Sequence, residues 1–455
     1  MNENRDRIFL LEKEKIKVSL LKLGVPTMVG MLVSAFYNIV DGFFVGRLGT
    51  LQMVAVSVIY PLTMVGTGIG LLFGNGASSN ISRALGKKDY DSVKTYSSTA
   101  MISGMLTIIC FVGMMLIFFD PLIHLLGATK NSFDYTREYG TIFIIGLIFN
   151  VFNMMMNNLI VSEGGSLFGM ITMLVGGGAN LILDPVLIFG CDLGVGGAAI
   201  ATLVSRMIST GMYLLYLWKG NTYLKVSFKY FRPTGFIYKE IFKIGLPICL
   251  FQFLSGGAVG LTNVVAKPFG EAAIAAMGIV NRIMSLETQA LYGFLKGYSP
   301  LVGYNYGAGN KARVQEATKT AVFWSTAVNA LFGIICIVFA KQLIYLFNQE
   351  SGQVLEIGSL ALRVDGISFI TLGIQIVIGN YFLAVGKAKQ GGMLSIFRQG
   401  LFFIPLLLIL SSLFGLNGLI LAQLFADICA TMMTLLMWRK EQKGIPNAGG
   451  SPVIR

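Results

Sequence analysis

The chain has 455 residues, of which 55% are hydrophobic and only 13% are charged, and its mean hydropathy is +0.72. About 25% of the residues in a typical soluble domain are charged, so this composition excludes a soluble globular protein and indicates a polytopic membrane protein. The net charge of +13 would suggest a nucleic-acid partner for a soluble chain, but here the positions of the basic residues explain it. One histidine and five scattered cysteines exclude a bis-histidine haem, a histidine-based metal cluster and a disulfide framework.

Hydropathy predicts twelve apolar spans, each near or above the roughly 20 residues that a helix needs to cross a bilayer. Their approximate cores are 18–44, 52–81, 93–118, 136–161, 167–190, 195–218, 238–265, 272–302, 314–340, 356–385, 393–414 and 417–438. The predicted organisation is a cytoplasmic N-terminal segment at 1–22, a first lobe of helices 1–6 at 23–218, a basic cytoplasmic linker at 219–240, a second lobe of helices 7–12 at 241–438 and a cytoplasmic tail at 439–455. No connection is long enough to hold a soluble catalytic domain.

The basic residues predict the orientation. With the N-terminus inside, 26 of the 35 Lys and Arg residues fall in cytoplasmic segments, 6 fall in outer segments, and Arg206, Arg282 and Lys296 fall inside spans. Cytoplasmic loops of membrane proteins carry an excess of Lys and Arg. We therefore expect a multi-pass protein of the plasma (inner) membrane with both termini cytoplasmic.

The second half of the chain repeats the first at an offset of 221 residues. This offset places several glycines and prolines of the two halves on one another: Gly24 on Gly245, Pro26 on Pro247, Gly76 on Gly297 and Gly86 on Gly307. Six spans per half is an even number, so both halves insert in the same orientation and are related by an axis along the membrane normal. The sequence therefore predicts an all-α membrane protein of two pseudo-symmetric six-helix bundles, related as parallel repeats with a cleft between them, which is transporter architecture.

Two acids inside spans of the first half lack counterparts in the repeat, Asp41 in IVDG and Asp184 in ILDP. A charged residue at the bilayer centre is disfavoured by about 2.5–3.5 kcal/mol, so such residues are usually functional. Asn180 shares a helix face with Asp184 because residues i and i+4 stack, and Thr202 enters at a similar depth. These oxygen ligands suit Na⁺ or a shared proton, so the four residues form a predicted cation site, with Na⁺ as its candidate metal.

Other polar residues inside the spans have either a substrate-binding or a structural interpretation. Asn150, Asn153 and Asn157 form a stripe on span four, which lines a substrate cavity or joins helices. Glu287 on span eight has two interpretations: it binds a cationic substrate, or it has a structural role. Tyr37, one turn before Asp41, is a further candidate residue of the substrate cavity. Asp365 and Arg363 near the outer end of span ten suggest a solvated ion pair.

Three enzyme-like functions are excluded. The glycines at 66–70 lie inside a span rather than between a strand and a helix, so they form no dinucleotide loop. The sequence contains no Walker A pattern, so ATP is not the driving force. An intramembrane aspartyl protease pairs a YD with a GxGD motif, which differs from IVDG and ILDP, and the full-length repeat has no place in that class.

Four segments of the chain are characteristic in combination: P-x10-YNIVDGFFVG, SEGGSLFGMITMLVGGGANLILDP, GVGGAAIATL and FLAVGKAKQ. On these segments the chain resembles the multidrug and toxic compound extrusion (MATE) family, near its MepA-like and DinF-like branches, and the resemblance covers the twelve spans. Val161 departs from the pattern, since relatives commonly carry Arg before the EG pair.

The resemblance implies a V-shaped pair of lobes, a first-lobe cation site at Asp41, Asn180, Asp184 and Thr202, and a helix bend at Pro26. It also implies a secondary transporter rather than an enzyme, which exports organic cations and amphiphilic drugs against inward H⁺ or Na⁺. The alternative is a flippase of lipid-linked oligosaccharides or lipids from the same wider superfamily, which usually has a more cationic cavity. We expect no cofactor, a monomer, and small molecules and membrane lipid rather than nucleic acid as partners.

Overall fold

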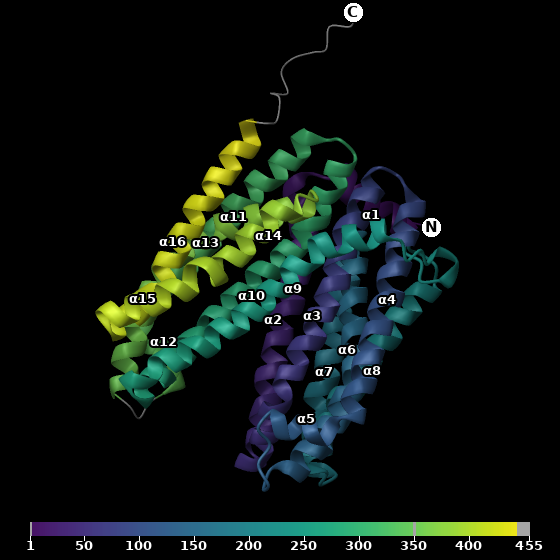
Figure 1. Ribbon diagram of the computed structural model, residues 1–455. Coiled ribbons are helices and arrows are strands. Elements are labelled where there is room, and N and C mark those ends of the chain that lie inside the picture. The colour runs from purple at the N-terminus through teal and green to yellow at the C-terminus, as the bar shows by residue number, and fades with distance from the viewer. Residues whose placement is uncertain (1, 349–351, 444–455) are drawn as a thin grey trace, which may run out of the picture. The chain divides into compact units, whose positions relative to one another are not determined.

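The structure is a computed structural model that describes residues 2–348 and 352–443. Within these ranges the chain forms helices and no strands, which confirms the predicted all-α class (Figure 1). The helices up to the linker are α1 (Asn2–Glu12), α2 (Ile16–Gly46), α3 (Thr50–Gly86), α4 (Tyr90–Ile117), α5 (Phe119–Leu125), α6 (Phe133–Ser162), α7 (Ser166–Pro185), η1 (Val186–Gly190), α8 (Gly194–Trp218) and η2 (Phe228–Tyr230). Those after it are α9 (Gly235–Ala266), η3 (Lys267–Phe269), α10 (Glu271–Gly307), α11 (Lys311–Val338), α12 (Ala340–Phe347), α13 (Gly352–Ala384), α14 (Ala388–Ile396), η4 (Phe397–Phe403), α15 (Ile404–Phe414) and α16 (Leu416–Lys443).

Twelve long helical segments confirm the predicted number of spans. Eleven of them, among the residues described, are long and apolar enough to cross a bilayer, with η1, η3 and the α14–η4–α15 series each counted within one span. The twelfth, α10, has 37 residues, as many as α3, but carries Arg282, Glu287 and Lys296 in its interior. Charge rather than length therefore separates α10 from the other eleven. The short helices α1, α5 and α12 were not predicted, and the part of the predicted tail after residue 443 lies outside the described residues.

The chain divides into two compact units. The first comprises Met1–Gln252 and Tyr292–Ala308, and the second comprises Phe253–Leu291 and Gly309–Arg455. The division falls inside α9 and α10, so each of these helices contributes one part of its length to each unit. The first unit thus contains, besides α1–α8, two helix segments from the second half of the sequence.

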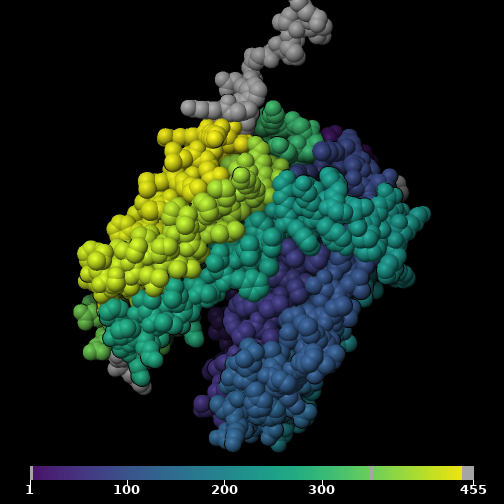
Figure 2. All heavy atoms as spheres, viewed as in Figure 1, coloured from purple at the N-terminus to yellow at the C-terminus, as the bar shows by residue number. Residues whose placement is uncertain are grey.

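Within the first unit, long helices pack along their length. Figure 1 shows α3, α6, α7 and α8 running alongside one another, and α2 packs against α7. In the space-filling view the side chains of the purple and blue helices fill the spaces between neighbouring helices (Figure 2). Large apolar side chains such as Leu106, Ile109 and Met114 on α4 are nevertheless about half exposed, at 53%, 48% and 51%. Such exposed apolar surface is typical of a membrane-interacting face.

Glycines related by the 221-residue repeat lie at close helix contacts within the first unit. A Cβ atom at each of six glycines would overlap a residue of a neighbouring helix: Gly24 with Phe294, Gly297 with Leu23, Gly76 with Ile241, Gly245 with Leu72, Gly86 with Tyr304 and Gly307 with Arg83. The repeat therefore places glycine on both sides of each contact, so that helices from the two halves of the sequence approach at backbone distance.

Candidate functional site

The two intramembrane acids of the first half lie together. Asp41 on α2 and Asp184 on α7 belong to helices that pack against each other, and their two carboxyl groups interact. Asp184 is 1% exposed, and its Oδ1 accepts a hydrogen bond of 3.1 Å from Asn180 Nδ2. Its Oδ2 is buried without a donor among the described residues. A proton shared with Asp41 would satisfy that oxygen, because two ionised carboxylates have no donor between them.

Local structure explains how Asp184 is presented. Asp184 is the second-to-last residue of α7. Pro185, which has no N–H, ends the helix, and the chain continues as one turn of π-helix, η1. Turns of π-helix inside α-helices often occur at functional sites. Tyr37 lies one turn before Asp41 on α2, and its ring packs against α7, since a Cβ at Gly177 would lie 3.0 Å from Tyr37 Cδ1. Thr202 on α8 is half-buried, and the described contacts include no hydrogen bond from it to either acid.

A basic residue accompanies the acids. Arg206 on α8 interacts electrostatically with Asp41, Tyr37 and Tyr139, and its guanidinium lies 4.7 Å from the ring centroid of Phe143. Its Nη1 is buried and has no hydrogen-bond acceptor in the described part of the chain. Sequence reasoning assigned Arg206 no role, although a cation inside a predicted span was a signal that could have identified it. The interior of the first unit therefore contains positive as well as negative charge.

The asparagine stripe of α6 connects several helices. Asn153 Nδ2 donates to the Arg206 carbonyl at 2.8 Å, and its Oδ1 accepts from Thr210 at 2.8 Å. Asn157 is 5% exposed, donates to the Tyr213 hydroxyl at 3.0 Å, and accepts from Lys296 of α10. Both amides thus have a donor and an acceptor partner, which is the arrangement expected of residues that join helices.

The second unit contains its own buried charge cluster. Arg398 in η4 forms an ion pair of 2.8 Å with Asp427 of α16, and Glu287 of α10 interacts electrostatically with Arg398. Glu287 is 6% exposed, and its Oε2 is buried without a hydrogen-bond donor among the described residues. Glu287, Arg398 and Asp427 lie on three different helical segments. Residue spacing along one segment therefore could not identify them as partners.

The environment of Asp365 differs from the solvated ion pair with Arg363 that the sequence suggested. The carboxylate is 3% exposed and interacts with Asp427 and Arg398, whereas Arg363 is exposed. Residues two positions apart on a helix point to different faces, so the two side chains cannot meet. The interpretation of Asp365 and Arg363 as a solvated ion pair was therefore wrong.

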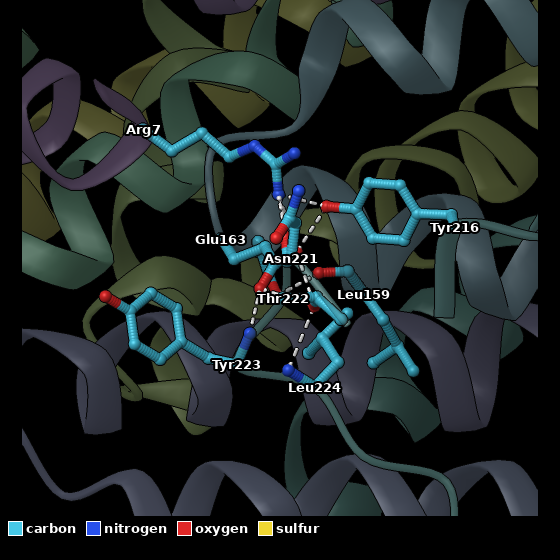
Figure 3. Close-up of polar contacts among 9 residues, drawn as sticks. Arg7, Leu159, Glu163, Tyr216, Asn221, Thr222, Tyr223 and Leu224 are labelled. Carbon is cyan, nitrogen blue, oxygen red and sulfur yellow. Dashed lines mark hydrogen bonds and ion pairs between the residues drawn. The ribbon is translucent and has the colours of Figure 1, made fainter. Parts of the chain in front are cut away.

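A third polar cluster surrounds the turn between α6 and α7, where Glu163 is 1% exposed (Figure 3). The Glu163 carboxylate accepts hydrogen bonds from Thr222 Oγ1 at 2.7 Å, from the Tyr223 N–H at 3.0 Å and from the Tyr216 hydroxyl. It also pairs with Arg7 Nη1 of α1 at 3.2 Å. One carboxylate thus joins α1, α8 and the linker to this turn.

Replacing Glu163 by Ala should lower the thermal stability of the detergent-solubilised protein strongly. The change leaves the Arg7 charge and the Thr222 and Tyr223 donors without this acceptor, and breaking a buried ion pair costs about 3–5 kcal/mol. Asp91→Ala is the matched control, because Asp91 pairs with Lys94 at 2.9 Å but its side chain is 88% exposed. An exposed pair contributes about 0–1 kcal/mol. Equal melting temperatures for the two variants would contradict a structural role for the Glu163 cluster.

Comparison with known proteins assigns the family. The MatE family model matches residues 26–186 and 247–409 of this chain. The chain belongs to the MATE family. The two matched segments begin 221 residues apart, so the family comparison independently finds the repeat offset read from the sequence.

The MATE assignment is supported along nearly the whole chain. "Multidrug export protein MepA" of Staphylococcus saprophyticus is 30% identical over 435 residues, which cover 95% of this chain and 96% of that protein. A crystal structure of MATE in complex with MaL6 matches with a TM-score of 0.90 at 26% identity and covers 96% of this chain and 98% of that one. An outward-facing conformation of a multidrug resistance MATE family transporter matches with a TM-score of 0.89 at 27% identity, covering 95% and 97%. This MATE protein is a membrane transporter and not an enzyme.

Proposed function

We propose that this MATE protein exports organic cations and amphiphilic drugs from the cell in exchange for an inward-moving cation that binds at Asp41 and Asp184. The observation that carries the proposal is the interaction between these two carboxyl groups, one of which has a buried oxygen without a donor among the described residues. The relatives named as multidrug export proteins support the substrate class.

The coupling ion we propose is H⁺. Asp41 and Asp184 can share one proton, and the electrostatic contact of Arg206 with Asp41 already supplies positive charge to the site. Asn180 turns its amide N–H toward Asp184 Oδ1, and Thr202 has no described contact to either acid. A proton requires fewer oxygen ligands than Na⁺, so this arrangement favours proton binding over a Na⁺ site at Asp41, Asn180, Asp184 and Thr202.

We propose that binding of the ion moves helix α2. Pro26 lies inside α2, where its ring removes a helix hydrogen bond and clashes with the preceding turn. Beside it, Thr27 Oγ1 donates back to the carbonyls of Leu23 and Gly24 at 2.9 and 3.0 Å, a contact that often bends helices. Ion binding can shift the transporter between two arrangements only if the ion prefers one of them. A change in the bend at Pro26 would provide that preference by moving Asp41 relative to Asp184.

Drug export from vesicles with imposed gradients tests the proposal. The purified protein is reconstituted, an H⁺ or Na⁺ gradient is applied separately, and export of a fluorescent organic cation is followed. A Tyr230→Cys variant reports the orientation, because we propose that the linker and both termini are cytoplasmic. Export driven by Na⁺ alone would reject the proton, and lipid translocation without gradient-driven drug export would favour the flippase.

Glu287→Gln should change which cations are exported while gradient coupling persists. Glu287 presents a buried carboxylate oxygen without a described donor in the second unit, a feature suited to a cationic substrate. We expect the rate ratio between a large and a small organic cation to change, as measured in the same vesicles. Glu271→Gln is the matched control, since Glu271 is an exposed acid on the same helix. Equal loss for every substrate would instead make Glu287 structural or part of coupling.

A further inference from the structure

Lys296 is a cation inside the first unit that the proposed ion site does not use. It lies on the segment of α10 that belongs to this unit, and its side chain is half-buried. Its Nζ donates to Asn157 Oδ1, a neutral amide oxygen. Among the described residues no carboxylate forms an ion pair with it, and no charged group interacts with it electrostatically.

An ammonium group in this position has unused binding capacity. Lys offers three donors, and the described contacts use one of them. Intramembrane charges are expensive, and they usually pair with another group or mark a substrate pathway. The described residues therefore supply no counter-charge for Lys296, which leaves its charge available to a bound molecule.

Its partner Asn157 is held in place. The amide is 5% exposed and its Nδ2 donates to the Tyr213 hydroxyl at 3.0 Å, so its oxygen remains directed toward Lys296. The lysine is therefore fixed at one end of the α6 stripe.

Arg206 does not offer the same site. Its guanidinium interacts electrostatically with Asp41 and lies over Phe143, near Gly146. Gly146 and Asn157 are eleven positions apart on α6, which corresponds to about 16 Å along the helix. The Arg206 guanidinium thus lies beside α6 near Gly146, and Lys296 lies beside it near Asn157.

We propose that Lys296, positioned by Asn157, binds the carboxylate of zwitterionic amphiphilic substrates. The inference rests on the proposed export function and specifies part of its substrate range. A carboxylate fits better than a phosphate, because a single lysine supplies one point charge whereas a phosphate monoester carries nearly two negative charges. Substrates with a carboxylate and a cationic group would use Lys296 for the first.

A pair of dyes that differ only in this group tests the proposal. Rhodamine 110 has a free carboxylate, and rhodamine 123 is its methyl ester. Binding of both is measured by fluorescence anisotropy to purified full-length protein in detergent, without any gradient. This readout is independent of coupling, so failure of gradient-driven export and failure of carboxylate recognition are distinguishable.

We expect Lys296→Met to weaken binding of rhodamine 110 about tenfold and to change binding of rhodamine 123 less than twofold. Lys296→Arg should retain the preference, and Lys319→Met, which removes an exposed lysine of α11, should alter neither dye. Equal loss of both dyes in Lys296→Met, or no change for either, would overturn the proposal and leave Lys296 as a contact between α10 and α6. Wild-type protein that binds the ester more tightly than the acid would also overturn it, whether or not the variants fold.

Discussion

Asp41→Asn should abolish gradient-driven export while drug binding persists. The amide imitates the neutralised carboxyl group and keeps the size of the side chain, but it can no longer gain or lose the coupling ion. A proton moved inward down a pH difference of about 2 units contributes about 2.7 kcal/mol, so loss of this coupling should lower drug accumulation about 100-fold under that gradient. Uptake into inverted vesicles under a defined gradient measures the accumulation, and dye binding in detergent measures the retained affinity.

Pro26→Ala provides the contrast to this variant. It restores a helix hydrogen bond in α2 and leaves Asp41 and Asp184 unchanged, so export should weaken with less effect on ion binding. Asp41→Asn protein that still accumulates drug at the wild-type level would remove the carboxyl pair from the coupling mechanism. Identical ion affinities and export rates for Pro26→Ala and the wild type would remove only the proposed bend.

Gly86→Ala should separate the ends of α3 and α10 in the first unit. A Cβ at Gly86 would overlap the Tyr304 carbonyl oxygen and lie 2.9 Å from the Ala308 nitrogen. Overpacking of this kind costs about 1–3 kcal/mol, which corresponds to roughly a 5- to 150-fold shift in population toward the separated arrangement. The alkylation rate of a single cysteine at Leu23, a fully buried position, measures that population.

The repeat supplies a second test of the same contact. Gly307→Ala should have a similar effect, because its Cβ would overlap the Arg83 carbonyl oxygen. Gly113→Ala is the control, since no atom lies within 4 Å of the position its Cβ would take and the gain in helix propensity is the same. Alkylation rates that are equal in all three variants would show that the glycine contacts do not hold these helix ends together.

Sequence alone determined the twelve long helices, but not the short helices α1, α5 and α12. Hydropathy is a sum over neighbouring residues, so it locates a span without reference to the rest of the chain. It placed α10 correctly despite Arg282, Glu287 and Lys296, because 37 residues of one helix contain enough apolar side chains around those charges. Sequence also identified Asp41 and Asp184 as a candidate pair, since the energetic penalty of an intramembrane acid applies whatever its partner.

The tertiary structure decided which charges meet. Arg206 accompanies Asp41, Arg398 pairs with Asp427, and Lys296 meets Asn157, and in each case the two residues lie on different helices. Such contacts depend on how each helix is rotated about its axis and how closely its neighbours pack, and hydropathy contains neither quantity. The helical periodicity could have ruled out Asp365 and Arg363 as partners, but only the packing of α13, η4 and α16 supplied the groups that Asp365 contacts instead.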